Sequence, residues 1–108
     1  MRTGLVGVVV GLLTAGGVLR AETAIERGAV LYGAQKCAMC HAVAGKGNAK
    51  GPLDGVGKKL SAEDIRQWIV DAPGMTARTK APRRPAMKAY SLPKEDVEAL
   101  VAYMVSLK

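Results

Sequence analysis

Apolar and small residues recur at helical spacing directly after Glu22. Thr23 followed three residues later by Glu26 forms a capping box, the usual start signal of a helix. The positions that then fall at i, i+3, i+4 and i+7 are Ile25, Gly28, Ala29 and Tyr32. This pattern predicts a first helix that runs to about Gln35.

Two further stretches show the same period. Ser61 with Asp64 is another capping signal, and the helix that it opens should end before Pro73. Its inward face is predicted to carry Ile65, Trp68 and Ile69. A third helix is predicted to begin near Pro93 and to reach the carboxyl terminus, with acidic residues in its first turn. Its apolar stripe is Val97, Leu100, Val101 and Met104.

The segments between these helices have no sustained periodicity. Residues 42–59 contain five Gly, one Pro and four Lys, which indicates a long loop that wraps over a scaffold. Residues 73–93 contain four prolines and five cations without an acidic residue, so we expect an extended or irregular segment. Because no pair of alternating apolar runs would form a sheet, the predicted fold class is all-α.

The first 21 residues differ from the rest in composition. Arg2 precedes an uncharged, glycine-containing run that ends before Arg20 and Ala21, the layout of a signal peptide. Cleavage is the preferred interpretation and leaves one domain, residues 22–108. Leu19 is large for the cleavage site, so an uncleaved membrane anchor stays open. We therefore predict a periplasmic protein, in contact with a membrane only if the segment is retained.

Residues 22–108 have little large apolar material for a core. They contain no Phe, three Tyr and one Trp. A domain of this size buries only about 60% of its unfolded surface, and a metal or bound group commonly supplements such a core. A buried prosthetic group would meet this need.

One motif supplies the chemistry. Cys37-Ala38-Met39-Cys40-His41 is C-x-x-C-H, the pattern in which two thiols attach a haem covalently and the imidazole ligates its iron. A thioredoxin-like site would need flanking strands that the pattern lacks, and zinc would need four ligands where the chain offers two Cys and one His. A disulfide would close a loop too short to stabilise much.

With this motif in place, residues 22–108 resemble the small bacterial monohaem class I cytochromes c. The helix-crossing residues of that family have counterparts in Gly28, Tyr32, Leu100 and Tyr103. The resemblance implies a cytochrome c fold, with three main helices and long loops wrapped around one covalently bound haem c. It also implies that the Pro52 carbonyl, in Gly51-Pro52, accepts a hydrogen bond from the ligating imidazole.

The second axial ligand must come from another residue type, because His41 is the single histidine. Methionine is the remaining strong candidate. Met1, Met39 and Met104 are poorly placed, which leaves Met75 and Met87. The resemblance favours Met87 by its distance from the carboxyl terminus, although the family usually has Pro where this chain has Lys88.

A His/Met pair keeps iron six-coordinate and favours electron carriage over catalysis. The resemblance further implies that Trp68 binds a haem propionate, with simple core packing as the alternative. We expect a monomeric, non-enzymatic carrier with a redox donor and acceptor, a basic face that meets an acidic docking surface, and no nucleic-acid partner. Alternatives are a haem sensor with an open sixth position and a haem-free thiol-disulfide oxidoreductase.

Overall fold

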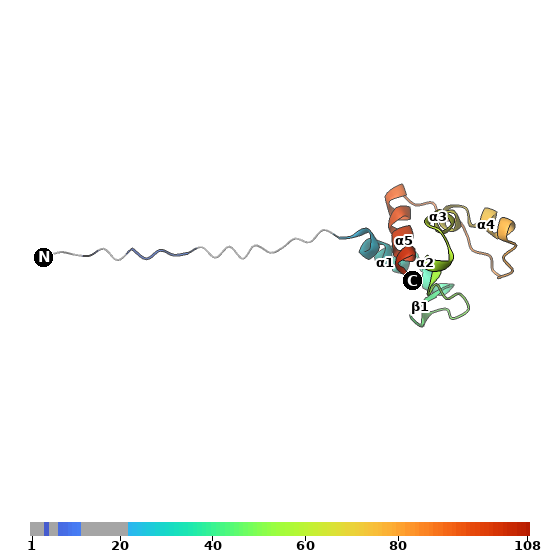
Figure 1. Ribbon diagram of the computed structural model, residues 1–108, viewed down its shortest axis with the longest axis horizontal. Coiled ribbons are helices and arrows are strands. Elements are labelled where there is room, and N and C mark those ends of the chain that lie inside the picture. Colours follow the sequence, from blue (N-terminus) through green and yellow to red (C-terminus); the bar gives the residue numbers. More distant parts are fainter. Residues whose placement is uncertain (1–3, 5–6, 12–21) are drawn as a thin grey trace.

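The computed structural model describes residues 4, 7–11 and 22–108. The predicted signal segment at residues 1–21 therefore lies, apart from residues 4 and 7–11, outside the described residues. Within the described part of the chain, no helix is both long and apolar enough to cross a membrane. Residues 22–108 fold into a group of helices joined by long loops (Figure 1).

Five α-helices carry the described fold. They are α1 (Ala24–Ala34), α2 (Val56–Lys59), α3 (Ala62–Val70), α4 (Ala72–Thr79) and α5 (Lys94–Ser106). A single 3₁₀ turn, η1 (Cys37–Met39), follows α1, and two-residue strands β1 (Ala42–Val43) and β2 (Lys46–Gly47) form a small antiparallel hairpin. The predicted all-α class with three main helices, at α1, α3 and α5, is confirmed.

The capping residues act as the sequence predicts. The Thr23 hydroxyl accepts a hydrogen bond from the Glu26 backbone N–H at 3.1 Å, and the Ser61 hydroxyl accepts one from the Asp64 N–H at the same distance. Each satisfies a backbone donor that the first helical turn leaves without an intrahelical acceptor. The starts of α1 and α3 are therefore set by local chemistry.

The prediction that residues 73–93 form an irregular segment is wrong for residues 73–79, which are helical. Helix α4 begins at Ala72, where the Asp71 side chain accepts a hydrogen bond from the Gly74 backbone N–H at 3.2 Å. Pro73 lies in the first turn, where its missing N–H costs no hydrogen bond. Within the predicted loop at residues 42–59, the hairpin and α2 are likewise short elements that the pattern missed. Residues 80–93 contain no helix or strand.

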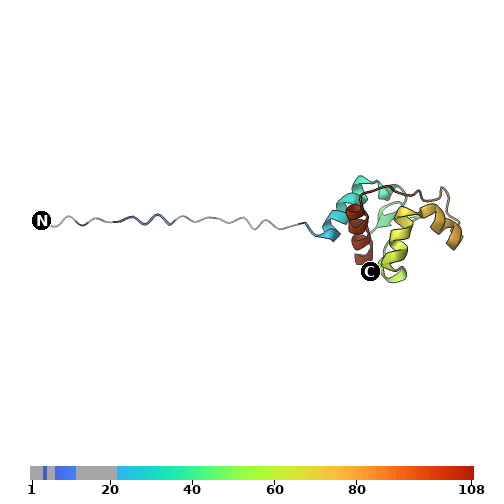
Figure 2. The same ribbon diagram turned by 90° about the horizontal axis from the view of Figure 1, so that it is seen from above.

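Helices α1 and α5 cross closely (Figure 2). Gly28 makes the crossing possible. A Cβ atom at Gly28 would collide with the Ala99 carbonyl oxygen and the Tyr103 Cβ. Beside this contact, the Tyr32 and Tyr103 rings pack edge to face with centroids 5.7 Å apart. The predicted packing of Gly28 and Tyr32 against α5 is confirmed.

The core is thin and lies beside a cavity. Its buried side chains come mainly from three helices: Leu31 and Tyr32 of α1, Ile65 and Ile69 of α3, and Val97, Leu100, Val101 and Met104 of α5. Within the described residues, no large side chain is completely enclosed. The apolar side chains thus pack against one another on one side and face open space on the other.

We predict that Gly28→Ala lowers the free energy of unfolding by about 1–3 kcal/mol, because the added methyl group overpacks the crossing. Denaturant unfolding followed by circular dichroism measures the change. Gly33→Ala is the matched control: it lies in the same helix, with nothing within 4 Å of an added Cβ. We expect it to stabilise by about 0.5–1 kcal/mol through helix propensity. Equal effects of the two substitutions would contradict the role given to Gly28.

Candidate functional site

The two cysteines lie on one tight turn after α1. Lys36 adopts a left-handed backbone conformation, with φ 58°, and changes the direction of the chain after α1. The 3₁₀ turn η1 then extends from Cys37 to Met39. The backbone N–H groups of Cys40 and His41 both donate to the Cys37 carbonyl, at 3.1 and 2.9 Å. Because side chains three apart are eclipsed in a 3₁₀ turn, both thiols point to the same side. Both are free.

Asn48 holds this turn in shape, a role that the sequence interpretation missed. Its backbone N–H donates to the carbonyls of Ala38 (3.1 Å) and His41 (2.9 Å), and its side-chain amide donates to the Met39 carbonyl at 3.1 Å. Gly47, with φ 109°, brings the chain close enough, since a Cβ there would strike the His41 carbonyl. The Gly47-Asn48 pair was the available signal, because both residue types favour special turn geometry.

The His41 ring is held by a backbone carbonyl, but not by the predicted one. Its Nδ1 donates to the Gly51 carbonyl at 3.0 Å, so the assignment of this role to Pro52 is wrong by one residue. Gly51 and Leu53 hydrogen-bond to Ala42, and Pro52 pairs with Ala42 in an isolated parallel bridge. Successive carbonyls in such extended backbone point in opposite directions, so the Pro52 carbonyl faces away from the ring.

The bond to Gly51 decides which nitrogen of His41 is available to a metal. A carbonyl only accepts, so Nδ1 carries the proton and Nε2 keeps its lone pair. Burial lowers the pKa of His41; the Gly51 bond opposes this shift, and the charge of Arg83 adds to it. The ring is therefore neutral at neutral pH and ready to ligate through Nε2.

The environment of Cys37 does not favour a nucleophilic thiolate. Burial raises the pKa of Cys37, the opposite of the shift that makes a redox-active cysteine reactive. Within the described residues, no three His, Cys, Asp or Glu side chains gather where a metal ion would need them. The site therefore gives no support to a thiol-disulfide oxidoreductase or to a zinc centre.

A cavity of about 600 Å³ opens beside the turn, within the size range of ligand pockets. Cys37, Cys40 and His41 line it together with Met87. The helices and loops around it contribute mainly apolar side chains, among them Leu53, Val56, Leu60, Ile65, Trp68, Ile69, Ala86, Leu100 and Met104. Two thiols, one neutral imidazole and a mainly apolar wall fit a porphyrin with an iron atom, and haem would complete the thin core.

Among the described methionines, Met39, Met87 and Met104 line this cavity and Met75 does not. Met87 is half-buried, whereas Met75 is a buried residue of α4 whose sulfur accepts a hydrogen bond from the Arg78 guanidinium at 3.1 Å. Met104 belongs to the core of α5, and Met39 is 71% exposed on the turn itself. Of the two candidates left open by the residues, Met87 alone reaches the cavity.

Two further predicted features lie at the same cavity. Trp68 is half-buried in its wall, on the face of α3 that also carries Ile65 and Ile69, and its contact with a propionate stays a prediction. Lys88 lies next to Met87 and places its ammonium 5.2 Å from the centre of the Tyr90 ring. Tyr90 also anchors this segment to α3, since its backbone N–H donates to the Ile69 carbonyl at 2.8 Å.

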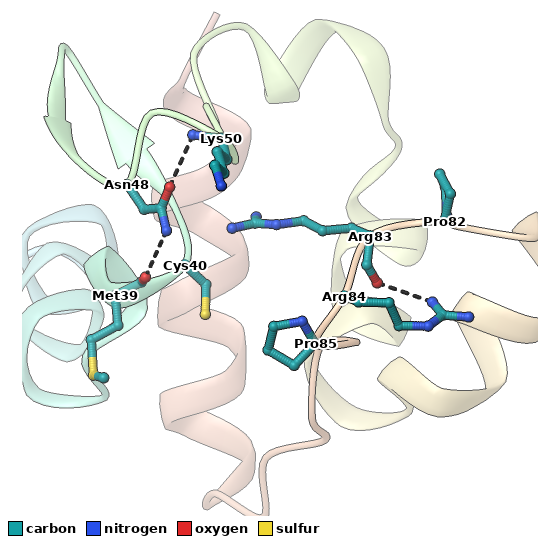
Figure 3. Close-up of a pocket in the computed structure, with 8 residues that line it drawn as sticks. All are labelled: Met39, Cys40, Asn48, Lys50, Pro82, Arg83, Arg84 and Pro85. Carbon is teal, nitrogen blue, oxygen red and sulfur yellow. Dashed lines mark hydrogen bonds between the residues drawn. The ribbon is translucent and has the colours of Figure 1, made fainter.

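A second hollow, of about 610 Å³, adjoins the cysteine turn (Figure 3). It lies between the turn and Asn48–Lys50 loop on one side and residues 82–85 on the other. Three of its eight lining residues are cations, Lys50, Arg83 and Arg84, and none is acidic, so we call this hollow the basic cleft. Cys40 lines both the basic cleft and the apolar cavity.

Comparison with known proteins agrees with this geometry. Residues 25–108 match the protein family described as cytochrome c. The chain is also 32% identical, over 96 residues, to cytochrome c oxidase subunit 2 of Alkalihalophilus pseudofirmus. That match covers 81% of this chain but 27% of the relative, so the chain spans about a quarter of the relative's length. No solved structure matches.

We predict that the double substitution Cys37→Ser with Cys40→Ser abolishes covalent haem attachment, because no thiol remains to form a thioether bond. Haem staining after denaturing electrophoresis measures it: the unmodified chain should stain and the double variant should not. Met39→Ser, between the two cysteines and 71% exposed, is the control and should stain fully. Staining of the double variant would refute attachment through these thiols.

Proposed function

Because the chain belongs to the cytochrome c family, we propose that it is a one-electron carrier whose single haem c is bound through Cys37 and Cys40 and ligated by His41 and Met87. When bound, haem would supply an iron atom that gains and loses one electron. The observation that carries the proposal is the shared cavity: both thiols, the imidazole and the half-buried Met87 line the same mainly apolar space.

Each ligand has a distinct task. The Gly51 carbonyl orients the His41 ring and increases its basicity, as partners of ligating histidines do in metal sites. The Met87 thioether is a soft, uncharged ligand that favours the reduced state relative to a second nitrogen ligand. With both axial positions filled by the protein, electron exchange needs no ligand to enter or leave, which favours a carrier over a sensor with an open position.

Location and partners belong to the proposal as well. Cytochrome c domains are extracytoplasmic and typically carry electrons. We place this one in the periplasm, exported by residues 1–21, as a monomer that exchanges electrons between a protein donor and a protein acceptor. The relative is named as an oxidase subunit, which makes a respiratory chain the favoured context.

The basic cleft supports an acidic docking partner. Lys50, Arg83 and Arg84 line it without a compensating carboxylate, and Cys40, a point of haem attachment, lies in its wall. A partner with carboxylates on its surface would be steered to this face and would meet the chain close to the haem. The surface charge would thus direct association to the side of the molecule on which Cys40 lies.

Met87→Ala should abolish the charge-transfer band between ferric iron and a thioether in the oxidised protein, because the sulfur ligand is lost. Visible absorption spectroscopy detects the band. Met75→Ala is the control and should keep it, since the Met75 sulfur contacts Arg78 and does not line the cavity. If the unmodified protein shows no band, or if Met75→Ala removes it, the His/Met carrier as proposed is wrong.

Salt should slow electron exchange with anionic hexacyanoferrate and accelerate exchange with cationic hexaammineruthenium, because the basic cleft attracts the first reagent and repels the second. Stopped-flow measurements from about 10 mM to 1 M ionic strength test this, a range over which the Debye length falls from about 30 to 3 Å. Arg84→Gln should reduce the salt dependence, and Lys94→Gln, which lies outside the cleft at the start of α5, should change it less. Equal salt effects on the two reagents would contradict docking at this face.

A further inference from the structure

Arg83 is placed unusually close to the support of the His41 ring. A Cβ atom built on Gly51 would collide with the Arg83 Nη1 and the Cys40 carbonyl, and would lie 3.0 Å from the His41 Nδ1. The guanidinium, the Gly51 backbone and the imidazole edge therefore meet at one point. Figure 3 shows the side chain extended from residues 82–85 across the gap toward the loop of Asn48 and Lys50. Only glycine at position 51 leaves room for this approach.

The charge of Arg83 is not neutralised within the part of the chain that the structure describes. The ion pairs there use other arginines: Arg27 with Asp96, Arg66 with Glu63 and Glu98, and Arg78 with Asp71. The cations nearest in the cleft, Lys50 and Arg84, add charge of the same sign. Arg84 instead turns its guanidinium back to the carbonyls of Ala81 and Arg83, at 3.3 and 3.0 Å.

We propose that Arg83 raises the reduction potential of the site by holding its guanidinium against Gly51, whose carbonyl binds the His41 ring. This inference rests on the proposed haem ligation by His41. When one electron is gained from the donor, the net charge of the site falls by one, and a fixed positive charge nearby favours that state. The same cation draws electron density from the Gly51 carbonyl, which weakens its pull on the Nδ1 proton and makes His41 a poorer donor to ferric iron.

Arg83 is thus a positioning residue rather than a ligand, and it connects the two axial sides. It lies four residues before Met87 and lines both the apolar cavity and the basic cleft. Its position next to Gly51 brings the segment that carries Met87 close to the backbone that holds His41. The neighbouring Arg84 carries the same charge in the same segment but does not reach Gly51, which makes it a matched control.

The test is a spectroelectrochemical titration of the haem-loaded protein and its variants. Arg83→Gln, and Arg83→Met as a second neutral variant that keeps the aliphatic stem, should lower the equilibrium constant for reduction about tenfold. A tenfold change corresponds to about 59 mV for one electron. Arg83→Lys should recover most of the loss, and Arg84→Gln should cause less than half of it. The thioether charge-transfer band should persist in all variants.

Two results would overturn the inference. One is a shift for Arg83→Gln and Arg83→Met no larger than that for Arg84→Gln, which would reduce Arg83 to general surface charge. The other is a potential that becomes pH-dependent near neutrality only in the Arg83 variants, because this would assign Arg83 to a haem propionate instead of to Gly51. Absence of covalent haem or of the band in the unmodified protein would refute the proposed function itself, and is checked before any variant.

Discussion

The hydrogen bond from His41 Nδ1 to the Gly51 carbonyl is the interaction on which the site depends. It fixes the tautomer, so that Nε2 carries the lone pair, and it sets the plane of the ring. It also ties the cysteine turn to the loop that comes after it, because the same carbonyl accepts the Ala42 N–H at 3.0 Å. Gly51 has no side chain, and Arg83 occupies the space that one would fill.

The packing of the helices leaves room for a group that the chain does not itself contain. Helices α1, α3 and α5 bury their apolar stripes against one another, yet no large side chain in the described residues is fully enclosed. A chain without Phe and with a single Trp has too little apolar volume to close this space. An apolar group held in the cavity would bury the exposed flanks of α3 and α5, so that stability and function would have the same origin.

Local signals in the sequence were enough for the three main helices and for the attachment motif. The caps at Thr23 and Ser61 and the glycine at Gly28 depend on nearby backbone geometry, and each acts as the pattern indicates. Helix α4 was missed because the four prolines of residues 73–93 indicated an irregular segment, and the capping role of Asp71 was not recognised. The carbonyl at Gly51, the Asn48 contacts and the position of Arg83 join segments distant in sequence, and no periodicity reports such contacts. Met87 came from resemblance, and the cavity then distinguished it from Met75.

The contacts of Asn48 have a consequence for the speed of electron exchange. Its backbone and side chain bind three carbonyls of the turn from Ala38 to His41, so the His41 imidazole lies in a frame that the chain itself builds. A frame of this kind does not rearrange when the charge at its centre changes by one. In the proposed carrier, such a frame would keep the protein's share of the nuclear reorganisation small and so lower the intrinsic barrier to each transfer.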